Sequence, residues 1–326
     1  YDYLRCACAV PDVTVGNPDA NVDAMLALAD RCEAQSRPDI IVFPELCITG
    51  YTCGDLFFQR PLQIAACRGL ERCAETWRER SFAALVGLPL TVDGQLYNCG
   101  VLLYHGRIAG IVPKTMIPTY NEFYEKRWFE SAVQLTRRTV DAVDLGLSGM
   151  SDTDIPIGND LIFTLGDVGL GVEICEDLWA PVSPGNLLAL AGAEVLCNLS
   201  ASNETISKRR YRRDLVSQQS ARCLCAYVYC SAGGKESTTD LIFSGHTVIA
   251  ENGTVLSENE ETIASDYLSV SDIDVGKLRA DRCKIKTFAQ SAALYGRPVR
   301  TVRIDNADNL PTSDGTLYPV SRTPFV

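Results

Sequence analysis

The sequence predicts a single α/β domain with mixed β-sheets, on two observations. Apolar, β-branched runs alternate with helical patterns from end to end of the 326 residues, which is typical of sheets covered by helices. Strand-like runs also follow one another directly, too often for a purely parallel sheet joined by helices, so both parallel and antiparallel pairs are expected. No repeat, low-complexity tract or linker divides the chain.

The first half of the chain alternates helical and strand patterns. Asn17 can cap a helix, Pro18 fits its first turn, and apolar residues then recur at helical spacing. His105-Gly106 is typical of a tight hairpin turn. In order, we expect a helix from Asn17, a strand at 39–43 ending at Pro44, a helix at 62–80, a strand at 83–88, and a hairpin of 99–104 with 107–112.

The second half follows a less periodic stretch, residues 131–160, which we expect to be a long surface excursion. Ser183-Pro184 can cap and open a helix, and residues 204–222 predict a helix with many cations. The expected strands are 168–174, 194–199 and 226–230, followed by a hairpin of 241–250 with 254–257 across Glu251-Asn252-Gly253. We expect the domain to cover residues 1–305 and the polar stretch 306–326 to be a tail or linker.

The composition argues against several classes of function. A net charge of −11 disfavours nucleic-acid binding, which needs clustered cations. No stretch approaches the ~20 apolar residues of a membrane span. The first ten residues lack the basic region and cleavage site of a signal peptide. We therefore expect a cytoplasmic protein.

The cysteines and histidines of the chain argue against disulfides and metals. Fourteen cysteines in a large chain without an export signal indicate reduced thiols. The Cys-x-Cys pairs at 6/8 and 223/225 would each put two small core residues on one face of a strand. His105 is expected to be exposed in its turn, and His246 to be structural in the late hairpin. With only these two histidines, no metal site is expected.

Three reactive side chains each follow a buried apolar run, where ligand sites of α/β sheets tend to lie. Desolvation of Glu45 after its strand would raise its pKa and make it a better base. Lys114 could present one cation at a cleft. Cys175 follows a Gly-rich strand at an elbow where backbone N–H groups could hold an oxyanion. Each alone could instead be a turn glutamate, a surface lysine or a core cysteine.

The base that would serve Cys175 is not expected to be a histidine. Cysteine hydrolases commonly use histidine, but both histidines of this chain lie in predicted hairpins with other roles. If Cys175 is the nucleophile, its base should be a carboxylate, and Glu45 is the natural candidate.

Three segments resemble the catalytic blocks of the nitrilase, or carbon–nitrogen hydrolase, superfamily, in the family's order of glutamate, lysine and cysteine. They are FPELCITGY (43–51), VPKTMIPTYNEFYEKRWF (112–129) and GVEICEDLW (171–179). The resemblance covers nearly the whole chain. It implies a four-layer αββα sandwich, often assembled into homo-oligomers, with Cys175 as nucleophile, Glu45 as general base and Lys114 as the oxyanion-stabilising cation.

Finer details, such as IPIGNDLIF (155–163), resemble the glutaminase domain of glutamine-dependent NAD synthetases. The resemblance implies that Glu125 is a supporting carboxylate that orients the lysine and the water. It places substrate-holding groups at Tyr120, Glu176, Ser202 and an arginine near Arg209, while Tyr51 and Phe129 line the pocket or pack in the core. The basic run 208–213 offers several candidates for the arginine, and could instead be a solvated helix face.

In that branch a second, ATP-using synthetase domain with a Ser-Gly-Gly-x-Asp-Ser phosphate loop receives the ammonia, and no such motif occurs in this sequence. The expected function is hydrolysis of the side-chain amide of glutamine, supplying ammonia for NAD synthesis from deamido-NAD. No cofactor is expected for this domain, since ATP and magnesium would belong to the synthetase domain. The alternatives are a stand-alone amidase for another small amide or N-carbamoyl amine, and an inactive scaffold.

Overall fold

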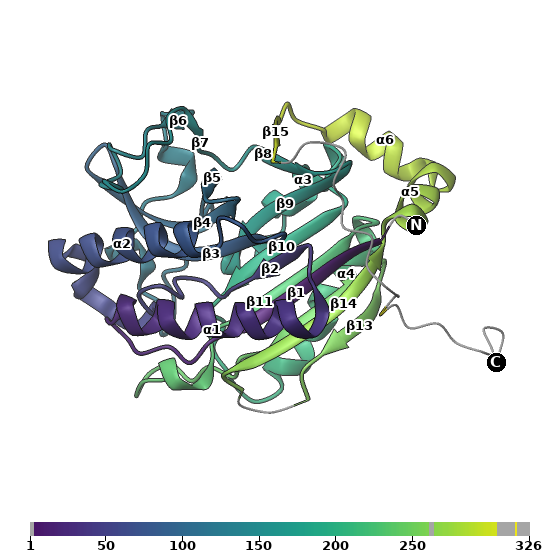
Figure 1. The fold of residues 1–326 in the computed structure, drawn as a ribbon. Helices are drawn as coiled ribbons and strands as arrows, with labels where there is room; N and C mark the ends of the chain where they lie inside the picture. The colour runs from purple at the N-terminus through teal and green to yellow at the C-terminus, as the bar shows by residue number, and fades with distance from the viewer. Residues whose placement is uncertain (1–2, 261–263, 305–316, 318–326) are drawn as a thin grey trace.

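The chain folds into four layers, helix–sheet–sheet–helix, in the computed structural model (Figure 1), which describes residues 3–260, 264–304 and 317. Two mixed sheets lie face to face, and helices cover the outer face of each. The α/β class and the αββα sandwich are therefore confirmed. The predicted boundary at residue 305 and the tail 306–326 lie, apart from Leu317, outside the described residues.

The first sheet has six strands among the described residues, in the order β14-β1-β2-β3-β4-β5. Its central pairs, β1 with β2 and β2 with β3, are parallel, and the outer pairs are antiparallel. The strands are β1 (Tyr3–Val10), β2 (Ile40–Val42), β3 (Ala83–Val92), β4 (Gln95–Tyr104), β5 (Arg107–Pro113) and β14 (Tyr267–Asp274).

The second sheet has seven strands in the described part, in the order β13-β12-β11-β10-β9-β8-β15. Strands β9, β10 and β11 run parallel, so their carboxyl ends meet at one edge. The strands are β8 (Leu161–Leu165), β9 (Val168–Ile174), β10 (Val195–Ser200), β11 (Ala226–Ser231), β12 (Thr247–Glu251), β13 (Thr254–Glu258) and β15 (Arg300–Arg303).

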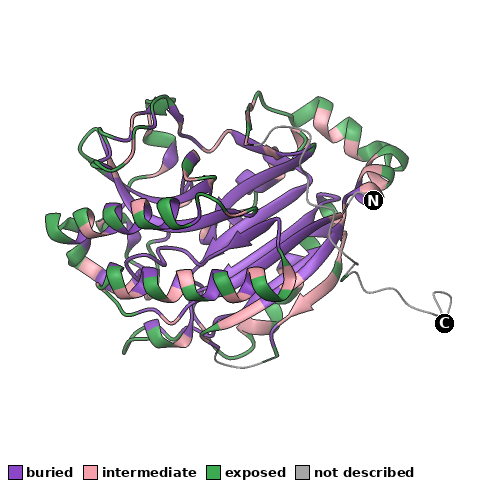
Figure 2. Cartoon of the chain, viewed as in Figure 1, coloured by how far each residue is buried: buried purple, intermediate pink, exposed green. Residues whose placement is uncertain are grey.

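Successive side chains of a strand point to opposite faces of the sheet, so two separate layers of apolar core form. On β1, Cys6 and Cys8 point into the core between the sheets, while Ala7 and Ala9 point into the core beneath the first pair of helices. Because both faces of the central strands are covered, these strands are buried along their length, as Figure 2 shows. The predicted core role of Cys6 and Cys8 is confirmed.

The helices cover the outer faces of the two sheets. The side chain of Asn17 accepts from the Ala20 N–H at 3.3 Å, and that of Ser183 from the Gly185 N–H at 2.9 Å, as their positions predicted. None of the helices in the described ranges is long and apolar enough to cross a membrane. They are α1 (Pro18–Ser36) and α2 (Arg60–Thr76) on the first sheet, α3 (Pro184–Leu190) and α4 (Lys208–Arg222) on the second, then α5 (Val275–Lys284) and α6 (Lys286–Tyr295).

Three expectations for local structure were wrong in part. Residues 241–246 are a loop before β12, because the turn at Gly245, with φ of +65°, ends the extended run. Cys223 and Cys225 flank a turn at Leu224, with φ of +44°, between α4 and β11 rather than sharing a strand face. The stretch 131–160 is not only a surface loop. It contains the small sheet of β6 (Thr139–Val140) with β7 (Ile155–Pro156), and it contributes apolar side chains to the core.

Short 3-10 helices mark the edge where the strands end and the chain crosses between segments. A cluster of apolar residues around Tyr51, Phe129 and Phe243 packs over this edge. The 3-10 helices are η1 (Tyr51–Phe58), η2 (Glu125–Arg127), η3 (Ala132–Gln134), η4 (Cys175–Trp179) and η5 (Gly234–Glu236). Three of them begin at a residue that the sequence marks as a site candidate: Tyr51, Glu125 and Cys175.

Gly87 on β3 lets the turn that carries Glu45 lie directly against the sheet. A Cβ at this position would lie 2.4 Å from the Leu46 nitrogen and 2.7 Å from the Pro44 oxygen, closer than real contacts allow. The Gly87 carbonyl also accepts the Ile48 N–H at 3.1 Å. A side chain on β3 would therefore push the Glu45 turn away from the sheet.

The substitution Gly87→Ala is expected to lower the free energy of unfolding by ~1–3 kcal/mol, the usual cost of overpacking, and to reduce activity by displacing Glu45. Chemical denaturation and a hydrolase assay measure the two effects. Gly100→Ala on β4 is the matched control, because its nearest neighbours are movable side-chain atoms of Leu199 and Val172 at 3.3 and 3.5 Å. Equal stability of both variants with the wild type would contradict this reading.

Candidate active site

Lys114 lies between two buried carboxylates. Its ammonium nitrogen is 2.7 Å from Glu45 Oε1 and 2.6 Å from Glu125 Oε1. All three side chains are at most 1% exposed. Three segments that are remote in sequence, the ends of β2 and β5 and the helix η2, therefore meet at one point, as the predicted site requires.

The Glu45 carboxylate is held on several sides. The Glu45 N–H donates to the Ser200 carbonyl at 3.3 Å, which ties this turn to the end of β10 on the facing sheet. Asn98 Nδ2 on β4 donates to Glu45 Oε1 at 2.6 Å and lies 3.5 Å from Glu125 Oε2. Asn98 was not among the predicted site residues, and a polar residue in an otherwise apolar strand is the signal that could have found it.

Tyr51 joins the same network rather than only packing in the core. Its hydroxyl donates to Glu125 Oε1 at 2.8 Å, so this carboxylate oxygen accepts from both Tyr51 and Lys114. Its N–H donates to Glu236 Oε2 at 2.7 Å. The predicted supporting role of Glu125 is consistent with this position, since Glu125 contacts the ammonium of Lys114 together with Glu45.

Cys175 is the first residue of η4, directly after β9, with φ of +43°. A non-glycine residue in the left-handed region is uncommon, and such strain is typical of a nucleophile exposed at a strand-to-helix turn. The Cys175 N–H donates to Asn198 Oδ1 at 3.2 Å, and Asn198 in turn donates to the Tyr227 hydroxyl at 3.0 Å. The turn is therefore fixed from β10 and β11.

Electrostatic interactions link Cys175 to the charged side chains of Glu45 and Lys114. Burial raises the pKa of the Cys175 thiol well above its usual range, the negative charge of Glu45 adds to this, and the positive charge of Lys114 opposes it. The thiol is therefore protonated at rest and needs a base. Burial also raises the pKa of Glu45 to about 7, against the opposing charge of Lys114. A carboxyl group with this pKa can accept and return a proton near neutral pH.

Asp177 joins the cysteine turn to the lysine segment. Its buried carboxylate accepts the Ile174 N–H at 3.0 Å from the end of β9 and the Met116 N–H at 2.7 Å from the segment after Lys114. Burial and the nearby charge of Glu173 raise the pKa of Asp177 to about 8. The sequence analysis did not predict this structural role of Asp177, although Asp177 lies two residues after Cys175.

An open cavity of about 900 Å³ lies beside the segments that carry Lys114 and Cys175. It is lined by Tyr120, Phe129 and Glu176, among other residues. The Tyr120 hydroxyl donates to Glu176 Oε2 at 2.9 Å. Tyr120 is 48% exposed, and Glu176 is half-buried, so both can reach a ligand. Phe129 is buried against Phe57, with ring centroids 4.9 Å apart, and thus both packs and lines the cavity.

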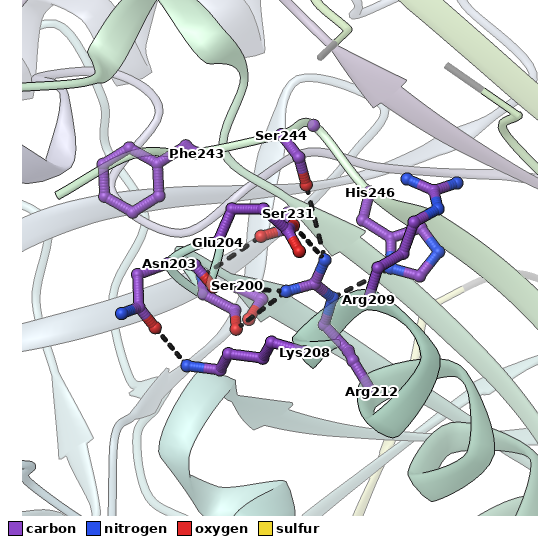
Figure 3. Close-up of polar contacts among 12 residues, drawn as sticks. Ser200, Asn203, Glu204, Lys208, Arg209, Arg212, Ser231, Phe243, Ser244 and His246 are labelled. Atoms are coloured by element: carbon purple, nitrogen blue, oxygen red, sulfur yellow. Dashed lines mark hydrogen bonds and ion pairs between the residues drawn. The ribbon is translucent and has the colours of Figure 1, made fainter. Parts of the chain in front are cut away.

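Lys208, rather than Arg209, interacts electrostatically with Cys175, and Figure 3 shows the side chains of Lys208 and Arg209 on different sides of Arg212. Arg209 lies against the Asn259 carbonyl and 3.7 Å from Glu258. The Lys208 ammonium lies 5.3 Å from the ring centre of Trp179 and donates to Asn203 Oδ1, and negative charge on Cys175 would raise its pKa. Burial lowers the pKa of Lys208. The basic run 208–213 thus does reach the site, through its first residue.

Ser202 is buried at the end of β10, and its N–H donates to the Ser231 hydroxyl at 3.1 Å. Its hydroxyl accepts from Arg212 at 3.2 Å, which leaves its hydrogen to donate elsewhere. Among the residues that the structure describes, no group of three or more His, Cys, Asp or Glu side chains is arranged to hold a metal ion.

Comparison with curated proteins finds relatives about twice as long as this chain. A glutamine-dependent NAD(+) synthetase of Mycobacterium tuberculosis is 37% identical over the whole of this chain, which covers 47% of that protein. One of Thermotoga maritima is 27% identical over 97% of this chain and 49% of its own length. The chain therefore spans about half the length of the curated relatives it matches.

Solved structures agree with these relatives. A glutamine-dependent NAD(+) synthetase from Cytophaga hutchinsonii superposes with a TM-score of 0.72 at 28% identity, over 83% of this chain and 43% of that one. An amidase from Nesterenkonia sp. has a TM-score of 0.64 at 19% identity, over 87% and 95% of the two chains, a likeness of fold alone. The carbon–nitrogen hydrolase family matches residues 6–282. The chain belongs to the carbon–nitrogen hydrolase family.

Proposed function

We propose that the chain hydrolyses the side-chain amide of glutamine, with Cys175 as nucleophile, Glu45 as general base and Lys114 as oxyanion-stabilising cation. The observation that carries this proposal is the buried contact of Lys114 with Glu45 and Glu125 beside the Cys175 turn. The relatives that carry glutamine dependence in their names support the choice of glutamine among amides.

The first half of the reaction forms a thioester. Glu45 accepts the thiol proton as Cys175 Sγ attacks the amide carbon, because the buried thiol is protonated at rest. The oxyanion is stabilised by Lys114 and by a backbone N–H of the Cys175 turn. The Cys175 N–H already donates to Asn198, so we assign this donor to Glu176. Glu45 then gives its proton to the leaving nitrogen, the C–N bond breaks, and ammonia departs.

The second half returns the enzyme to its starting state. Glu45 takes a proton from a water molecule that attacks the glutamyl thioester, and Lys114 again stabilises the oxyanion. The S–C bond breaks, Cys175 regains its proton, and glutamate leaves. Glu125 keeps the Lys114 ammonium in place throughout, because Lys114 contacts both carboxylates at once. The protons of the thiol and of the attacking water pass through Glu45, the new γ-carboxylic acid releases its proton to solvent, and no cofactor enters any step.

Charged and polar groups around the site match the charged end of glutamine. Its α-amino group would donate to the Glu176 carboxylate, which the Tyr120 hydroxyl already orients. Its α-carboxylate would bind the Lys208 ammonium and the free hydrogen of the Ser202 hydroxyl. We therefore propose Lys208 in place of Arg209 as the cation that binds the carboxylate.

The ammonia would serve NAD synthesis from deamido-NAD in a synthetase domain joined to this one. The length and the names of the relatives support this proposal. ATP and magnesium would act in that second domain. A cytoplasmic location and assembly into a homo-oligomer are further parts of the proposal, and both rest on the resemblance to the family.

Replacing the nucleophile tests the reaction class. Cys175→Ala is expected to abolish the release of ammonia from glutamine, because no thioester can form, while Cys283→Ala, which removes the exposed cysteine, retains it. A coupled ammonia assay measures both variants. If wild-type protein releases ammonia from N-carbamoyl amines but not from glutamine, the chain is an amidase of another specificity.

The pH profile tests the role of Glu45. A general base acts when deprotonated, so kcat/KM for glutamine is expected to fall as the pH drops below the Glu45 pKa of about 7 and to level off above it. Glu45→Gln should lower kcat by ~10²–10⁴-fold and remove this inflection. Glu75→Gln, on a side chain that is 71% exposed, is the control. An unchanged inflection in Glu45→Gln would assign the base elsewhere.

Removing the proposed carboxylate-binding cation should raise KM. Lys208→Met is expected to raise KM for glutamine ~10- to 100-fold, with a smaller effect on kcat. This factor corresponds to the free energy of one hydrogen bond to a charged group. Hydrolysis of a simple amide such as propionamide, which lacks the α-carboxylate, should hardly change. Lys284→Met, at a side chain that is 74% exposed, is the matched control. Equal losses for both amides would show that Lys208 does not bind the carboxylate.

A further inference from the structure

Arg212 on α4 is completely buried, yet it has no role in the chemistry described above. A buried guanidinium is costly unless its donors are paired. Figure 3 shows it surrounded by acceptors from two loops. Its nitrogens donate to His246 Nδ1 at 2.8 Å, Glu204 Oε2 at 2.7 Å, Ser202 Oγ at 3.2 Å, the Asn203 carbonyl at 3.4 Å and Ser244 Oγ at 3.4 Å.

These acceptors come from the two loops that flank the site on the second sheet. Residues 202–204 follow β10, whose carboxyl end also carries Ser200, the partner of the Glu45 N–H. Residues 244–246 precede β12 and follow Phe243, which packs against Tyr51 with ring centroids 5.8 Å apart. Arg212 thus joins both loops, in addition to the backbone hydrogen bond from the Glu204 N–H to the Ile242 carbonyl, and it reaches Ser202 directly.

His246 holds Arg212 as a neutral acceptor. Because Arg212 Nε donates to His246 Nδ1, the ring hydrogen lies on Nε2, which is 2.9 Å from Glu258 Oε1. Burial and the neighbouring arginines lower the pKa of His246 to about 2, so the ring stays neutral at any physiological pH. The contact therefore fixes the direction of the guanidinium without adding a second positive charge.

Lys208 precedes Arg212 by one turn of α4, so both point from the same face of the helix. Asn203 links the two cations: its carbonyl accepts from Arg212, and its side-chain oxygen accepts from the Lys208 ammonium. Arg212 also takes a lone pair of the Ser202 hydroxyl. The two groups assigned above to the α-carboxylate thus both depend on Arg212.

We propose that Arg212 is a positioning residue for substrate recognition, which holds the loop 202–204 so that Lys208 and Ser202 meet the charged end of the substrate. This inference rests on the proposed function, because it concerns the groups that would bind the α-carboxylate of glutamine. Arg212 itself touches neither the substrate nor the reacting atoms. Its loss should therefore weaken recognition of amino-acid substrates and spare the intrinsic reactivity of Cys175.

A purely structural role predicts a different outcome. If Arg212 only stabilised the fold, its loss would reduce every reaction of Cys175 alike. Two electrophiles separate the possibilities: diazo-oxo-norleucine carries the α-amino and α-carboxylate groups of glutamine, whereas iodoacetamide carries neither. Both alkylate a thiol, and peptide mapping by mass spectrometry distinguishes Cys175 from the exposed Cys283.

The experiment compares Arg212→Lys with Arg210→Met, a change two residues away on the same helix at a side chain that is 88% exposed. In Arg212→Lys, labelling of Cys175 by diazo-oxo-norleucine is expected to slow about 10- to 100-fold, and KM for glutamine to rise by the same factor, with kcat much less affected. Iodoacetamide labelling should stay within about twofold of wild type. Arg210→Met should match wild type in all three.

Glu204→Gln is the second variant, because Glu204 is partly exposed and its change leaves Arg212 in place. It should show the same selective loss to a smaller degree, and it decides the question if Arg212→Lys does not fold. Equal loss of both labelling reactions, or no loss in either, would overturn the positioning role. Failure of wild-type protein to react with diazo-oxo-norleucine would instead remove the proposed function itself.

Discussion

The site depends on one constraint: a buried ammonium, Lys114, must be balanced by carboxylates that the fold brings from distant parts of the chain. Desolvating three charged groups is expensive, and only close contacts and hydrogen bonds can offset that cost. Glu45 and Glu125 contact Lys114 at 2.7 and 2.6 Å, and Asn98 and Tyr51 donate to the carboxylates. Two carboxylates around one cation leave a negative charge in excess, which favours a basic Glu45.

The two sheets deliver these groups to one edge. In the first sheet β2 and β5 lead into the turns that carry Glu45 and Lys114, and in the second β9 and β10 lead into Cys175 and the loop of Ser202. The sheets are joined at that edge by the hydrogen bond from the Glu45 N–H to Ser200, and the cysteine and lysine segments by Asp177. The geometry of the candidate site is thus a consequence of how the sheets pack.

The places of Glu45, Lys114 and Cys175 after apolar runs could be predicted from the sequence, and their shared role from the resemblance of the three blocks to the carbon–nitrogen hydrolase family. The remainder depends on tertiary contacts. Successive helical residues are rotated by about 100°, so nothing local in the run 208–213 tells which residue approaches Cys175, and Lys208 does so instead of Arg209. The partners Asn98 and Asp177 likewise act only across segments.

Locating the covalent intermediate would show whether Cys175, Glu45 and Lys114 act at one shared site. Wild-type protein mixed with glutamine, quenched in acid and digested, should yield a glutamyl adduct on the peptide that contains Cys175, and hydroxylamine should release it as expected for a thioester. In Lys114→Met the adduct should not accumulate, because the oxyanion that precedes it loses its cation. Ammonia release with the adduct on another residue, or with no adduct in rapid-quench samples, would contradict the shared site of Cys175, Glu45 and Lys114.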